Sequence, residues 1–158
     1  TIEAIVKAGI PVQGHIGLTP QTASALGGFK IQGKDALAAK RIVDDARALE
    51  DAGAFSMIIE AVPAPLGEVI AEAVNIPVIG IGAGPNVDGQ VLVTHDMIGL
   101  FDKFVPKFVK QYTQIRPTII DAMKAYKQEV INKTFPAWEH SFNMSDETLA
   151  ELGKMIQK

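Results

Sequence analysis

The stretch Phe55-Ser56-Met57-Ile58-Ile59-Glu60-Ala61-Val62-Pro63 decides the fold of this chain. A short apolar run closed by a proline predicts a strand that helices cover on both faces of a parallel sheet. Glu60 is a carboxylate near the C-terminal end of that strand, where active sites collect in open parallel sheets and in α/β barrels. We therefore expect Glu60 to lie in an active site. The alternative is a glutamate that reaches solvent or pairs with a neighbouring cation.

Strand, loop and helix alternate upstream of this stretch. Residues 10–14 predict a short strand, and residues 15–34 form a loop longer than an ordinary connection, which favours a functional loop. Asp35 is expected to cap a helix that stops at Gly53. The apolar face of this helix consists of Ile42, Ala46 and Leu49.

The same unit repeats downstream. Pro65 suits the first turn of a helix that ends at Asn75, and residues 76–84 predict a third strand. Residues 90–94 predict a fourth strand, with His95 and Asp96 at its end. The apolar stripe of the helix consists of Leu66, Val69, Ile70 and Ala73.

The segment Gly80-Ile81-Gly82-Ala83-Gly84 lets backbone amides approach a ligand closely. A phosphate-binding loop and a tight turn needed for packing are the alternatives. Residues 85–89 do not open a helix, as a dinucleotide-binding fingerprint would require, so the tight turn is favoured. Asp88 and Gln90 most simply order this loop.

Composition excludes several classes of function. The chain has 158 residues, 47% of them hydrophobic, and a net charge of −3, so it can bury a sizeable core and has no basic field for nucleic acid or an anionic membrane. No apolar run is long enough to span a bilayer. The absence of cysteine excludes disulfides and thiol catalysis and is compatible with a reducing cytoplasm.

Both ends of the chain carry helical patterns. Residues 1–8 predict the end of an amphipathic helix capped by Gly9, and because a natural chain seldom opens in mid-helix without Met, we expect a segment to precede residue 1. A helical tail is expected from about residue 104, with helices that begin at Pro106, Pro117 and Ser145. Its surplus apolar faces predict packing on another subunit.

This alternation predicts an α/β fold. About four strands separated by helices fit either a small doubly wound sheet or part of a (β/α)8 TIM barrel. A complete barrel needs about 250 residues. We therefore expect residues 1–158 to form a single domain, the C-terminal half of such a barrel followed by the helical tail.

Short motifs in a fixed order carry a family resemblance. They are Gly14-His15-Ile16-Gly17-Leu18-Thr19-Pro20-Gln21, Gly27-Gly28-Phe29-Lys30-Ile31-Gln32-Gly33, Glu60-Ala61-Val62-Pro63, Ile79-Gly80-Ile81-Gly82-Ala83-Gly84, Asp88-Gly89-Gln90, His95-Asp96 and Glu139-His140-Ser141-Phe142. Together they resemble ketopantoate hydroxymethyltransferase (3-methyl-2-oxobutanoate hydroxymethyltransferase) of pantothenate biosynthesis. The resemblance covers nearly the whole chain. It implies a (β/α)8 barrel and a cytoplasmic, decameric, magnesium-dependent enzyme. That enzyme transfers a hydroxymethyl group from 5,10-methylenetetrahydrofolate to 3-methyl-2-oxobutanoate, which gives 2-dehydropantoate.

The resemblance also implies roles for particular residues. Glu60 resembles the proton acceptor of the family, and His15, expected on the strand-end loop beside the substrate, is assigned to substrate binding. The magnesium-binding aspartates of the family, its substrate-binding serine, and the lysine and glutamate that help to hold ketoacid and metal belong to the first half of the barrel. Nothing in this sequence matches them, so no metal ligand is named. We expect this chain to be inactive alone and to partner with that half.

The implied chemistry requires removal of a proton alpha to a ketone before a bond forms at C3, and a divalent ion chelated by substrate oxygens would stabilise the enolate. Glu60 could take that proton or manage protons on the folate nitrogen. For His15, donation to a substrate oxygen and a loop-ordering hydrogen bond are both open. His95, Asp96 and His140 are more typical of structural contacts.

Two other classes of protein stay open. A barrel lyase or aldolase of the phosphoenolpyruvate mutase type would share the strand-end acid and the glycine loop, but residues 14–21 and 27–33 argue against it. The second class is a non-catalytic half-barrel that serves as an assembly piece. A native mass measurement separates them, because a second polypeptide of roughly 100 residues would identify a divided enzyme.

Overall fold

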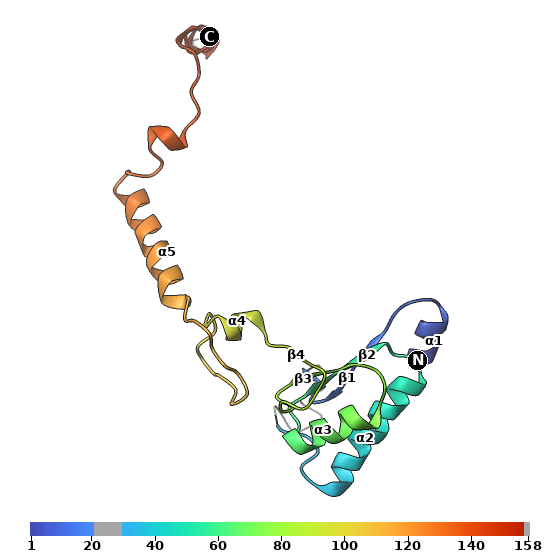
Figure 1. Ribbon diagram of the computed structural model, residues 1–158. Helices are drawn as coiled ribbons and strands as arrows, with labels where there is room; N and C mark the ends of the chain where they lie inside the picture. Colours follow the sequence, from blue (N-terminus) through green and yellow to red (C-terminus); the bar gives the residue numbers. More distant parts are fainter. Residues whose placement is uncertain (21–29, 157–158) are drawn as a thin grey trace. The chain divides into compact units, whose positions relative to one another are not determined.

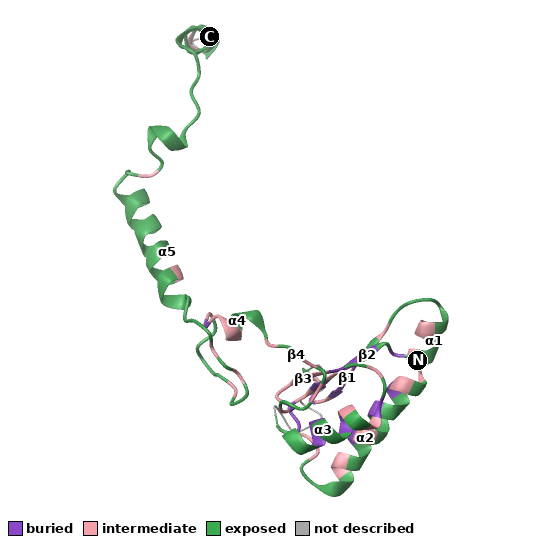
Figure 2. Cartoon of the chain, in the orientation of Figure 1, coloured by how far each residue is buried: buried purple, intermediate pink, exposed green. Residues whose placement is uncertain are grey.

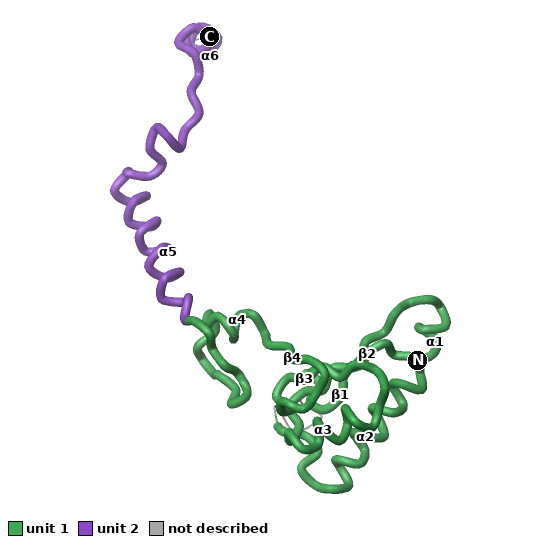
Figure 3. Tube along the Cα trace, viewed as in Figure 1, with its two compact units in different colours: residues 1–113 green, residues 114–158 purple. Residues whose placement is uncertain are grey.

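The computed structural model describes residues 1–20 and 30–156 (Figure 1). The chain divides into two compact units, Thr1–Thr113 and Gln114–Lys158 (Figure 3). The motif residues Gln21, Gly27, Gly28 and Phe29 lie outside the described residues.

A four-stranded parallel sheet organises the first unit. Its strands are β1 (Gln13–Gly17), β2 (Ser56–Glu60), β3 (Val78–Ile81) and β4 (Gly89–Gln90), and they pair in chain order. Helix α2 (Ala36–Asp51) connects β1 to β2, and helix α3 (Ala64–Ala73) connects β2 to β3. Parallel strands joined by helices confirm the predicted α/β class.

Helices α2 and α3 pack on the same face of the sheet (Figure 1). Alternate residues of β2, Met57 and Ile59, point to this face and are fully buried. They join one hydrophobic core with Ile42, Ala46 and Leu49 of α2, the face predicted from the helical spacing. Figure 2 shows this core as the buried part of the strands and helices.

The opposite face of the sheet is only half-buried in the described part of the chain. It carries His15 of β1, Ile58 and Glu60 of β2, and Ile79 of β3. The prediction that helices cover both faces of β2 is therefore wrong for these residues, because both crossover helices lie on the other side. Glu60 consequently lies on a face that solvent reaches.

Strand β1 begins later than predicted. The N–H of Ile10 donates to the carbonyl oxygen of Ile5 (3.2 Å), so Ile10 belongs to the C-terminal turn of α1 (Ile2–Lys7) and cannot start a strand there. Gly9, with φ +83°, ends this helix as predicted. The later start places His15 inside β1 instead of on the loop after it.

The buried face of helix α3 includes Gly67 and leaves out Val69, which the sequence pattern assigned to that face. Leu66 and Ile70 are buried as predicted, but Val69 is 50% exposed. Gly67 is buried and lies so close to Ala83 that an added Cβ would collide with the Ala83 carbonyl oxygen. The close approach of the glycine loop to α3 therefore excludes any side chain at this position.

Strand β4 is shorter than predicted and is followed by the short helix α4 (Thr94–Met97). The N–H of Asp96 bonds to the carbonyl of Val93 (3.0 Å), which closes the first turn of α4. His95 and Asp96 therefore lie in a helix, and the prediction that they follow a strand end is wrong.

The helix predicted from Pro106 is absent from the described residues. Val109 N–H closes a single turn on the carbonyl of Pro106 (3.0 Å). Phe108 packs against Gly82 instead, where an added Cβ would lie 2.7 Å from Phe108 Cδ1. This tertiary contact competes with helix formation in the loop.

The second unit contains α5 (Arg116–Ile131), the 3-10 helix η2 (Trp138–His140) and α6 (Asp146–Ile156). The predicted helix starts are confirmed, because Pro117 lies in the first turn of α5 and Ser145 Oγ accepts the N–H of Thr148 (3.2 Å) ahead of α6. None of these described helices contains a buried residue, so their packing on another subunit stays a prediction. Over residues 1–20 and 30–156, no helix is both long and apolar enough to cross a membrane.

Candidate active site

The candidate site is built at the C-terminal ends of β1, β2 and β3. The parallel register pairs Gly17 with Glu60, and Glu60 with Ile81, so these strands end at the same level. Because side chains alternate along a strand, His15 lies on the same face as its second neighbour Gly17 and therefore on the face of Glu60.

The two site residues predicted from the sequence contact each other. His15 Nε2 lies 3.1 Å from Glu60 Oε2, although 45 positions separate them in the chain. Their side chains are 32% and 16% exposed, respectively, so the pair is partly shielded but open to a ligand. Glu60 accepts this hydrogen bond from His15 in the tautomer that carries the proton on Nε2.

This pair has the chemistry of a proton-transfer site. A carboxylate can accept a proton from a substrate carbon, and a neighbouring imidazole N–H can orient that carboxylate or donate to a substrate oxygen. Both groups lie at strand ends of a parallel sheet, where catalytic groups of α/β proteins collect.

The glycine loop after β3 is ordered by local contacts. Gln90 Nε2 donates to the carbonyl of Gly84 (2.9 Å), as the sequence predicts. Asp88 Oδ2 accepts the N–H of Val78 (2.8 Å) at the start of β3, ahead of the loop. Gly84, with φ +89°, lies against Ala64 at the start of α3, where an added Cβ would collide. These contacts support the tight-turn interpretation of the loop over phosphate binding.

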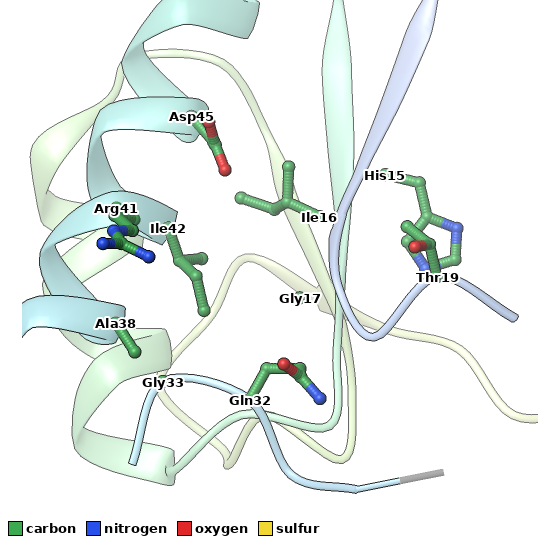
Figure 4. Close-up of a pocket in the computed structure, with 10 residues that line it drawn as sticks. All are labelled: His15, Ile16, Gly17, Thr19, Gln32, Gly33, Ala38, Arg41, Ile42 and Asp45. Carbon is green, nitrogen blue, oxygen red and sulfur yellow. The ribbon is translucent and has the colours of Figure 1, made fainter. Parts of the chain in front are cut away.

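A pocket of about 350 Å³ lies along β1, an outer strand of the sheet (Figure 4). Figure 4 shows His15 and Thr19 on one side of this strand, and Arg41, Ile42 and Asp45 of α2 on the other. Glu60 does not line the pocket. The pocket therefore belongs to the edge of the sheet, and its lining residue His15 contacts the Glu60 carboxylate.

The described residues do not fit a magnesium site. Within residues 1–20 and 30–156, no group of three or more His, Cys, Asp or Glu side chains is placed to hold a metal ion. Glu60 is a single carboxylate beside an imidazole, whereas magnesium sites combine carboxylates with water and substrate oxygens.

The other two histidines lie away from the candidate site residues in the sequence and in other elements. His95 lies exposed in α4. His140 belongs to the second unit, where its Nδ1 accepts the N–H of Ala137 (3.2 Å) and its ring lies 5.1 Å from that of Phe135. The contacts of His140 agree with the structural role expected for it, and the role expected for His95 stays a prediction.

Sequence reasoning missed the backbone around Glu60. Ala61 adopts φ +51°, which is uncommon for a residue with a side chain. The N–H of Leu18 donates to the Glu60 carbonyl (2.8 Å), and that of Gln32 donates to the Ala61 carbonyl (2.9 Å). In the sequence, Gly17 at the end of β1 is the local sign that the backbone of β1 comes close to the backbone of Glu60.

Comparisons with known proteins agree with the family resemblance. A family model described as ketopantoate hydroxymethyltransferase matches residues 1–138. The chain is similar to the 3-methyl-2-oxobutanoate hydroxymethyltransferase of Syntrophobacter fumaroxidans, at 52% identity over 157 residues, which is 99% of this chain and 56% of the relative. The enzyme of the same name from Heliobacterium modesticaldum is 59% identical over 147 residues, 93% of this chain and 53% of the relative. The enzyme of that name from Oleidesulfovibrio alaskensis is 57% identical over 146 residues, which is 92% of this chain and 50% of the relative. The chain spans about half the length of the curated relatives it matches.

Proposed function

This chain belongs to the ketopantoate hydroxymethyltransferase family, and from that premise we propose that the protein of which it forms part transfers a hydroxymethyl group to 3-methyl-2-oxobutanoate. The donor is 5,10-methylenetetrahydrofolate, the product is 2-dehydropantoate, and the reaction belongs to pantothenate biosynthesis in the cytoplasm. The half-barrel expected from the sequence agrees with the length of the relatives, which is about twice that of this chain.

The contact between His15 Nε2 and Glu60 Oε2 is the observation that carries this proposal to the residue level. It brings the proton acceptor and the substrate-binding residue expected from the family resemblance to one point at the strand ends. We assign Glu60 as the general base and His15 as a donor to the ketoacid.

In this mechanism, the Glu60 carboxylate takes the proton from C3 of 3-methyl-2-oxobutanoate. The electron pair of the C–H bond moves towards the keto oxygen and forms an enolate, whose C3 bonds to the methylene carbon of the folate. The two bonds from that carbon to the folate nitrogens break, water supplies the hydroxyl group, and the nitrogens take up the proton from C3 and the proton left by water. In the tautomer with a proton on Nε2, His15 donates to Glu60, and its partial exposure lets it reach a ketoacid oxygen when substrate enters. Magnesium, implied by the family resemblance, would need ligands from outside this chain, and the steps assigned to Glu60 and His15 do not pass through it.

The test is Glu60→Gln in the full-length enzyme, because glutamine keeps the shape of the side chain but cannot accept a proton. We expect turnover to fall about 10²–10⁴-fold, the usual contribution of a general base, with ketoacid binding changed far less. The matched control is Glu72→Gln, which alters an exposed glutamate of α3 and leaves the strand ends untouched. Near-normal turnover in a folded Glu60→Gln enzyme would remove Glu60 from the mechanism.

Assembly belongs to the same proposal. The exposed apolar side chains of α5 and α6, among them Met123, Ile131 and Met155, are available to pack on other subunits. We propose a homo-oligomer, a decamer by family resemblance, in which each subunit also contains the remaining strands of the barrel.

A further inference from the structure

The backbone after β2 is tied to each of the segments around it. Leu18 N–H donates to the Glu60 carbonyl (2.8 Å), Ala61 N–H donates to the Ile81 carbonyl (2.9 Å), and Gln32 N–H donates to the Ala61 carbonyl (2.9 Å). These donors and acceptors come from the end of β1, the end of β3 and the loop before α2. The direction in which Glu60 leaves its strand is therefore set by its neighbours.

Ala61 shows that this backbone is held under strain. Its φ of +51° lies in the left-handed region, where a Cβ is unfavourable. Its methyl group is buried at 7% exposure against Leu18, itself 4% exposed, in a cluster separate from the main core. A strained conformation persists only where the surroundings over-determine it, and such residues concentrate at functional sites.

Gly17 makes the close approach of β1 possible. It has φ +81°, and an added Cβ would collide with the Glu60 carbonyl oxygen and lie 3.1 Å from Val62 Cγ1. Only glycine therefore lets the N–H of Leu18 reach the Glu60 carbonyl. Any side chain at position 17 pushes directly on the residue that carries the carboxylate.

We propose that Gly17 and Ala61 are positioning residues that orient the Glu60 carboxylate beside His15 and towards the reacting carbon of the substrate. They act through the backbone and make no contact with the substrate. This proposal rests on the proposed function, in which Glu60 accepts a proton.

Gly9 provides a matched control for Gly17. Its φ of +83° is nearly the same, but an added Cβ at Gly9 meets nothing within 4 Å among the described residues. Gly17→Ala and Gly9→Ala therefore introduce the same backbone strain, and only the first displaces Glu60.

The experiment measures the melting temperature, kcat and ketoacid KM of both variants in the full-length enzyme. Both should lower the melting temperature. Gly9→Ala should keep the wild-type kcat, whereas Gly17→Ala should lower kcat about 10- to 100-fold, as expected for a small displacement of a catalytic group, with KM changed much less. A folded Gly17→Ala enzyme with wild-type kcat, or an equal loss of kcat in Gly9→Ala, overturns the proposal.

Ala61→Gly keeps the proposal testable if Gly17→Ala does not fold. Glycine adopts φ +51° without strain, so the fold should survive, but the methyl contact with Leu18 and the restriction of the backbone are lost. We expect a lower kcat at nearly unchanged ketoacid KM, and a wild-type kcat contradicts the positioning role of Ala61.

Glu60→Gln distinguishes failure of the proposed function from failure of the positioning proposal. An active Glu60→Gln enzyme contradicts the proposed function itself. An inactive one beside fully active Gly17→Ala and Ala61→Gly contradicts positioning alone.

Discussion

At the scale of single residues, the contact between His15 and Glu60 has to be separated from ordinary cross-strand pairing. The same two strands carry a second side-chain hydrogen bond at their other end, from Gln13 Nε2 to Ser56 Oγ (2.8 Å). Because Gln13 and Ser56 lie at the N-terminal ends of β1 and β2, that bond joins the strands without access to the candidate site. The chain thus contains a structural counterpart of the proposed catalytic contact.

This counterpart allows a sharp test of His15. His15→Ala in the full-length enzyme should raise the ketoacid KM about tenfold or more, because a hydrogen bond to a charged group contributes about 1.5–3 kcal/mol. Gln13→Ala removes the other cross-strand bond and should lower the melting temperature while leaving KM unchanged. Steady-state kinetics and thermal melting on the same preparations measure both. An unchanged KM in His15→Ala would limit His15 to joining the strands.

At the scale of elements, local signals set the ends of α2. Asp35 Oδ1 accepts the N–H of Ala38 (2.8 Å), so the predicted N-cap is confirmed, and Gly53 follows the helix with φ +85°. Capping depends on residues within one turn, which is why it can be identified from sequence. The helix in turn fixes where β2 begins and hence where Glu60 ends its strand.

Loss of this cap has a predictable cost. Asp35→Ala should lower the free energy of unfolding by about 1 kcal/mol, the usual contribution of an N-cap, and should lower the melting temperature by about 2–4 °C in a protein of this size class. Asp51→Ala changes the last residue of the same helix, where a negative charge opposes the helix dipole, and should leave the melting temperature unchanged or slightly higher. Thermal melting of the two full-length variants compares their melting temperatures with that of the wild type. Equal losses would mean that capping at Asp35 is not what stabilises α2.

At the scale of the whole molecule, the two outer strands of the sheet in the first unit each pair with one strand among the described residues. β1 and β4 are the outer strands in the order β1-β2-β3-β4, and the face that carries His15 and Glu60 is half-buried in the described residues. Free strand edges and uncovered apolar faces favour association with other chains. The curated relatives have about twice the length, which supplies enough residues for the strands that would close a barrel.

The isolated 158-residue chain should therefore self-associate or aggregate. Sedimentation velocity at several concentrations measures this directly. Addition of the remaining half of the barrel as a separate polypeptide should replace aggregation by an oligomer of defined size, because that half covers both sheet edges. A monomeric chain with a cooperative melt would contradict the half-barrel architecture.

Metal binding should also depend on the remaining half of the barrel. The isolated chain should bind magnesium only weakly, because Glu60 provides one carboxylate and no metal-binding cluster exists among the described residues. Titration calorimetry with MgCl2, on the isolated chain and on the full-length enzyme with ketoacid, compares the two affinities. Tight stoichiometric binding to the isolated chain would place the metal site within residues 1–158.

The sequence by itself determined the features that depend on neighbours in the chain. The alternation of apolar strands and amphipathic helices predicted the α/β class, the one-turn pattern at Asp35 predicted the cap of α2, and the run 55–63 placed Glu60 at a strand end. Where local and distant contacts compete, the same reasoning failed. Phe108 covers Gly82 instead of continuing a helix from Pro106.

Only the tertiary structure decided how the candidate site is assembled. The distance between His15 and Glu60 depends on the register of β1 against β2, in which His15 pairs with Ile58 and Gly17 pairs with Glu60. The left-handed conformation of Ala61 likewise depends on donors and acceptors from distant segments. No short stretch of sequence encodes these contacts, because their free energy comes from groups that meet only after the strands have paired.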